Sequence, residues 1–145
     1  MAFTRQRIPP GYLAEAWQEE SANGAELDAL RATLAEQLSM PVLLDYGRRY
    51  MHSIGQLYKG GPDSGMSLMI TYEKADDLPI PGTKYTFGQL EMALALGDLQ
   101  SLGSLGKPAL RLHLTEGVRP GLAALRRAVT RRSPPLDRKP KARAL

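Results

Sequence analysis

Residues 66–90 read MSLMITYEKADDLPIPGTKYTFGQL, and this stretch decides the fold class of the chain. Its first seven residues alternate in the period-two pattern that is typical of a β-strand. Turn-forming residues then crowd the segment between residues 76 and 84. Thr86 and Gln89 stand three residues apart, as the capping box at the start of an α-helix requires. The stretch therefore predicts a strand, a loop and a helix in succession.

The alternation of strands and helices is expected to continue on both sides of this stretch. In chain order, the expected elements are helices over 11–20 and 25–38, a strand over 42–44, a helix over 48–59, the strand over 66–72, a helix over 86–102, a strand over 110–114 and a helix over 119–132. Such alternation favours a parallel sheet with helices packed against it. The expected fold class is therefore α/β, with a short parallel sheet of three strands and two exposed edges.

The helix expected over 86–102 differs from the others because its apolar residues point in nearly every direction. They are Phe87, Leu90, Met92, Leu94, Leu96, Leu99 and Leu102. A helix that is apolar all round has to be covered all round, and a small sheet with a few helices leaves part of it bare. We therefore expect self-association or a partner chain.

Composition indicates a cytoplasmic globular protein and excludes several kinds of site. The 145 residues are enough for one domain with a real core. The chain has no cysteine and its 2 histidines lack metal-ligand spacing, so neither a metal nor a cofactor is expected. No apolar run reaches the ~18 residues that span a bilayer, and no signal core follows the N-terminus.

The net charge of +4 is distributed unevenly along the chain. Residues 126–145 hold eight Lys or Arg against Asp137, which leaves the other 125 residues with a charge of −3. We expect residues 1–10 to be a flexible lead, 11–132 an α/β domain and 133–145 a disordered basic tail. Such a tail can attract an acidic partner without the body recognising nucleic acid, or it can simply aid solubility.

The helix expected over 48–59 carries a polar edge that suits a phosphorylated sugar. His52, Gln56 and Lys59 lie about one turn apart on it. Histidine exchanges a proton near neutral pH, glutamine can hold a hydroxyl, and lysine can neutralise a phosphate. On spacing alone, a solvated helix face explains these three residues more simply.

The run from Gly47 to Pro62 resembles a helix of known enzymes. It is similar to Gly-x-x-Arg-Tyr-x-His-Ser-x-Gly-Gln-Leu-x-Lys-Gly-Gly-Pro in the phosphoglucose isomerase part of bifunctional transaldolase/phosphoglucose isomerases. Further stretches resemble the same family in the same order, and they are residues 77–82, 85–88, 95–102 and 110–114. The resemblance covers roughly residues 25–115. It implies part of the sugar isomerase fold, a three-layer α/β/α sandwich.

The resemblance also implies a chemistry and a set of site residues. Enzymes of the family interconvert glucose 6-phosphate and fructose 6-phosphate through an enediol, using a glutamate base, a histidine for ring opening and Ser/Thr loops that hold the phosphate. Carried over to this sequence, the catalytic residue is His52, the substrate-binding residues are Arg49, Gln56, Lys59, Gly60 and Gly61, and further candidates are Gln100 and Lys107. For the two glycines, a plain helix-to-strand loop is the simpler interpretation. Asp98 and His113 are expected to be a polar helix residue and a satisfied or exposed strand residue.

Two family features have no counterpart in the sequence: the phosphate loops, and the strand that precedes the helix at 25–38. We therefore expect no isomerase turnover from the chain alone. The first hypothesis is a stand-alone C-terminal phosphoglucose-isomerase-like module, or a remnant of one. It contributes to a glucose 6-phosphate/fructose 6-phosphate isomerase site with a partner chain, which is a second copy or a separate isomerase or transaldolase subunit. The second is a non-catalytic sugar-phosphate-binding or regulatory module whose basic tail reaches an acidic partner.

Overall fold

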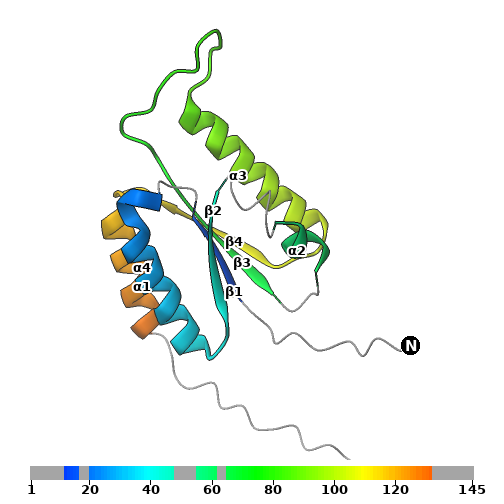
Figure 1. Ribbon diagram of the computed structural model, residues 1–145, viewed down its shortest axis with the longest axis vertical. Helices are drawn as coiled ribbons and strands as arrows, with labels where there is room; N and C mark the ends of the chain where they lie inside the picture. The colour runs from blue at the N-terminus through cyan, green and yellow to red at the C-terminus, as the bar shows by residue number, and fades with distance from the viewer. Residues whose placement is uncertain (1–11, 17–19, 48–54, 62–64, 132–145) are drawn as a thin grey trace, which may run out of the picture.

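The computed structural model describes residues 12–16, 20–47, 55–61 and 65–131. Strands and helices alternate along these ranges (Figure 1). The elements are β1 (Tyr12–Ala16), α1 (Glu20–Leu38), β2 (Val42–Tyr46), α2 (Gly55–Gly60), β3 (Met66–Tyr72), α3 (Phe87–Ser104), β4 (Ala109–Leu114) and α4 (Val118–Arg131). No helix within the described ranges is long and apolar enough to cross a membrane.

The described strands form one sheet in the order β2-β1-β3-β4, and every neighbouring pair is parallel. An all-parallel sheet has its crossover helices on its faces and is covered on both sides. Here α1 and α4 lie together on one face, and α2 and α3 lie on the other (Figure 1). The expected α/β class and its α/β/α layering are confirmed.

β1 is the element that the sequence does not predict. The helix expected over 11–20 is wrong for residues 12–16, and so is the expectation that no strand precedes α1. Ala14, Glu15 and Ala16 favour helices in isolation. However, β1 lies between β2 and β3 and pairs with both, and such a tertiary environment overrides a weak local preference.

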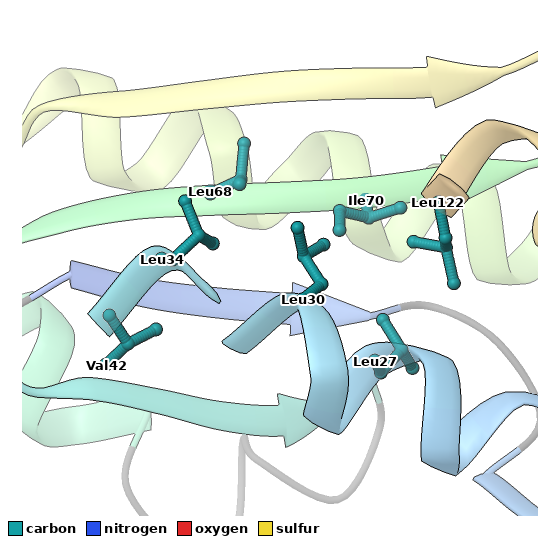
Figure 2. Packing of buried hydrophobic residues seen from close by; sticks show 7 residues of the cluster. All are labelled: Leu27, Leu30, Leu34, Val42, Leu68, Ile70 and Leu122. Atoms are coloured by element: carbon teal, nitrogen blue, oxygen red, sulfur yellow. The ribbon is translucent and has the colours of Figure 1, made fainter. Parts of the chain in front are cut away.

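The larger core lies between the sheet and the α1–α4 layer (Figure 2). Its buried members are Leu27, Leu30, Leu34, Val42, Leu68, Ile70 and Leu122. The α1 leucines belong to the stripe that the sequence predicts. The helix ends where expected, because Ser39 takes a left-handed φ of 50° and Pro41 follows it.

The opposite face of the sheet has a smaller apolar cluster. Met69 and Ala95 are its fully buried members, and Tyr58, Leu94 and Leu99 pack against them. The helix expected over 48–59 is described only as α2, and residues 48–54 lie outside the described ranges. The expected basic tail, 133–145, lies outside them as well.

The start of α3 matches its sequence signature. Thr86 Oγ1 accepts a hydrogen bond from Gln89 N at 3.2 Å, and Gln89 Oε1 accepts one from Thr86 N at 3.1 Å, which completes the capping box. The segment between β3 and α3, residues 73–86, extends beyond the sheet as an arm (Figure 1). An isolated antiparallel bridge between Pro79 and Thr86 closes the second half of this arm.

Candidate functional site

A buried ion pair joins α2 to the inner face of α3. The Nζ atom of Lys59, in the last turn of α2, lies 2.9 Å from Oδ1 of Asp98. Asp98 is 5% exposed, and the Lys59 side chain is 28% exposed. Lys59 is therefore held by a buried partner, which corrects the expectation of a solvated face for this one residue. The two residues are 39 positions apart, so helix spacing could not indicate the pair.

The second carboxylate oxygen of Asp98, Oδ2, is buried and accepts no hydrogen bond from the residues that the structure describes. Buried polar atoms nearly always have a partner, so each exception needs an explanation. A carboxylate oxygen without a donor costs about 1–3 kcal/mol or more. The contact between α2 and α3 is therefore a place where one further donor would be stabilising.

Lys107, which follows the C-terminal end of α3, lies close to the end of α2 as well. Its Nζ atom donates to the carbonyl oxygen of Gly61 at 2.7 Å. The turn after α3 fixes its backbone, because Lys107 N donates to Leu102 O at 3.0 Å and Gly106 takes the left-handed φ of 68° that the turn requires. Two lysines therefore lie at the end of α2: Lys59 belongs to its last turn, and Lys107 contacts Gly61 from the turn after α3.

The remaining predicted site residues fall into three groups. Gly60 is exposed, and the space that a Cβ atom would take there is open, so a ligand can approach the backbone. Gln100 is exposed on α3 two residues from the buried Asp98, so the helix turns it away from the ion pair. His52 and Arg49 lie outside the described residues, and Gln56 is described only as a backbone position of α2.

A second polar cluster lies where β3 and β4 approach their carboxyl ends, under α3. Arg111 donates from Nε to Thr71 Oγ1 at 3.0 Å, and its Nη2 lies 3.2 Å from Nδ1 of His113. Thr71 Oγ1 is itself 3.0 Å from that nitrogen. Arg111 also contacts Met92 of α3, with Nη2 3.3 Å from Sδ. These contacts confirm the expectation that His113 is a satisfied strand residue.

The site residues predicted from the sequence do not include this strand-end cluster, formed by Thr71, Arg111 and His113. The signal was present, since Arg111 and His113 alternate with leucines and therefore share one face of β4. Their partner Thr71 is 1% exposed and comes from the neighbouring strand, which no local pattern indicates. The described residues contain no group of three or more His, Asp and Glu that could hold a metal ion.

Comparison with known proteins supports the fold and adds no activity. No family model and no curated protein matches the sequence. A solved structure, the hypothetical protein TT0462 from Thermus thermophilus, matches with a TM-score of 0.68 and 18% sequence identity. The match covers 81% of this chain and 33% of the other, so the chain spans about a third of that neighbour's length. At this identity the likeness shows a shared fold.

Proposed function

We propose that the chain is a phosphoglucose-isomerase-like module that contributes to a glucose 6-phosphate/fructose 6-phosphate isomerase site together with another polypeptide. The observation that carries the proposal is the contact between Lys107 and Gly61. Both residues were candidates from the family resemblance, they stand 46 positions apart, and they meet at 2.7 Å.

The contacts of the two lysines near α2 suggest a different role for each. Asp98 already neutralises Lys59, and Lys107 Nζ lies at the carbonyl oxygen of Gly61, at the end of α2. In this proposal Lys107 supplies the positive charge for the phosphate, and Lys59 holds the side chain of Asp98 in place.

A ligand titration of the whole chain tests this division. Fructose 6-phosphate is added to the isotope-labelled protein, and amide shifts are followed by NMR. A charge-assisted hydrogen bond to phosphate contributes roughly 1.5–3 kcal/mol, so Lys107→Ala should weaken binding about ten- to a hundredfold. Lys84→Ala is the matched control, because Lys84 is exposed on the arm. The proposal is wrong if the wild type shows no shifts near Lys59, Gly61 and Lys107, or if both variants bind alike.

Activity and assembly are separate tests of the same proposal. We expect no turnover from the purified chain in a coupled isomerase assay, because holding substrate and base together accounts for ~7–11 kcal/mol of such a barrier and the sequence lacks the phosphate loops. Turnover that His52→Ala abolishes would contradict the need for another polypeptide.

Exposed apolar residues support the need for a partner. Phe87, Leu90 and Leu96 of α3 are 40%, 45% and 42% exposed, and Leu78 on the arm is 66% exposed. Exposed apolar surface beyond scattered single residues is usual at interaction sites. Sedimentation at high protein concentration should therefore show self-association, or a partner should be captured. A strictly monomeric chain that binds no apolar dye argues against both.

A further inference from the structure

The outer face of α4 is strongly basic. Arg119, Arg126, Arg127 and Arg131 are all exposed there, and the helix contains no acidic residue. Arg119 is held toward α1 by an ion pair with Glu26, with Nε 3.2 Å from Oε1. Among the described residues, none makes an ion pair with Arg126, Arg127 or Arg131. Three guanidinium groups are therefore available on this face, which we call the basic α4 face.

Helix geometry places these arginines opposite the buried side of α4. With 100° per residue, the four arginines fall within an arc of about 140° over about 18 Å of helix. Leu122, which is 2% exposed, lies on the other side with Val118, Leu125 and Val129, and all four pack into the α1–α4 core. The basic α4 face is thus fixed by core packing.

This arrangement favours one class of partner. A helix that lies in a membrane surface needs its apolar side free, but the apolar side of α4 is used by the core. Arginine presents a planar fork of donors that matches phosphate oxygens. The described part of α4 has no aromatic residue for stacking on bases. These features suit a repeated phosphate, contacted without recognition of sequence.

The residues that follow α4 in the chain have the same sign of charge. From residue 118 to the end, the sequence holds nine Lys or Arg against Asp137 alone. Polyanion binding strengthens with each added cation because each contact releases counterions. We propose that the basic α4 face binds the phosphate backbone of nucleic acid, independently of base sequence and of any sugar-phosphate site.

A salt titration of the full chain tests this proposal. The probe is a fluorescent duplex DNA of mixed sequence, about 20 base pairs long, and binding is followed by anisotropy. Three phosphate contacts predict a slope of log affinity against log salt of about −3, or a loss of roughly fortyfold from 50 to 200 mM, and the cations that follow α4 make the slope of the full chain at least this steep. A second duplex of scrambled sequence should bind equally well.

Charge reversal locates the surface. Arg126→Glu with Arg127→Glu should weaken binding at least about tenfold and make the slope shallower by about 2. The control reverses two basic residues elsewhere on the surface, Arg31→Glu on α1 with Lys84→Glu on the arm, which changes the net charge equally. That control should stay within about twofold of the wild type. Circular dichroism verifies that both variants are folded.

Three outcomes would overturn the proposal. The first is no duplex binding by the wild type at about 50 mM salt, where such contacts are strong. The second is an equal loss in the two double variants, which would mean that only net charge matters. The third is binding to vesicles of anionic lipid but not to duplex DNA, which would point to a membrane surface.

Discussion

The two faces of the sheet are built from different chemistry. The face under α1 and α4 is closed by leucines, valine and isoleucine, with no buried polar residue in its cluster. The face under α2 and α3 holds the three buried polar residues of the described chain, Ser67, Thr71 and Asp98. Burying a polar group costs free energy unless it has a hydrogen-bond partner. The α2–α3 face is therefore expected to contribute less to the free energy of unfolding than the α1–α4 face. The comparison indicates that one face is the main apolar core, while the other holds the buried polar groups.

The largest expected effect comes from breaking the apolar face. Leu30 is 1% exposed in the centre of the α1 side (Figure 2), so Leu30→Ala removes contacts and leaves a cavity. We expect it to lower the free energy of unfolding by about 2–5 kcal/mol. Leu96→Ala on α3 is the control, because 42% of that residue is exposed. Urea unfolding measures both, and equal losses would mean that the two faces contribute alike.

The Lys59–Asp98 pair is the next most sensitive point, on the polar face. Lys59→Met leaves the Asp98 carboxylate buried without its cation. Removing one partner of a buried pair costs about 3–5 kcal/mol, and we expect about 3 here because Lys59 retains some contact with water. The double variant Lys59→Met with Asp98→Leu should recover most of this loss, since it leaves no orphaned charge. A double-mutant cycle in urea checks this, and additive losses would show that the pair is not coupled.

Alanine substitutions at two helix glycines should change the stability of the fold in opposite directions. A Cβ atom at Gly121 of α4 would lie 2.8 Å from Leu114 Cδ2 and 3.2 Å from Leu114 Cβ, whereas one at Gly97 of α3 meets nothing within 4 Å. Gly121→Ala should therefore destabilise the fold by about 1 kcal/mol, because overpacking exceeds the gain in helix propensity. Gly97→Ala should stabilise it by about 0.5–1 kcal/mol. Thermal melts of both variants test this, and a shift of the same sign in both would contradict it.

The same division explains how much the sequence predicts. On the apolar face, helix spacing alone identifies Leu27, Leu30 and Leu34, because each leucine of the stripe meets the sheet. The capping box at Thr86 is equally readable, since it depends on residues three positions apart. Local patterns predict local structure, and they succeed wherever one element packs against one uniform surface.

The unpredicted features all depend on partners distant in sequence. β1 is a strand because two strands flank it, and Asp98 is ionically paired because α2 crosses α3 beside it. Family resemblance names Lys107 and Gly61 as separate candidates, and no sequence pattern predicts that the two residues meet. The polar face is thus the part of the molecule that a single sequence describes least well.

The smallest expected effect concerns the arm, which belongs to the polar side. The Asp77 carboxylate accepts a hydrogen bond from Gly88 N at 2.7 Å, and the hydrogen bonds from Thr86 and from Gly88 lower the pKa of Asp77 below its usual 3.8. A carboxyl group whose pKa is depressed on folding stabilises the protein above its unfolded pKa, and this contribution disappears as the pH falls through the folded value.

From about pH 5 to about pH 3, the wild type should therefore lose slightly more stability than Asp77→Asn, as urea midpoints will show. Asp76→Asn is the neighbouring control, because it removes a carboxylate from the same loop without touching the contact between Asp77 and Gly88. Gly88→Ala should mimic Asp77→Asn, because its Cβ atom would stand 2.6 Å from Asp77 Oδ2 and displace the carboxylate. If Gly88→Ala keeps the full pH dependence of the wild type, Asp77 does not act through this contact.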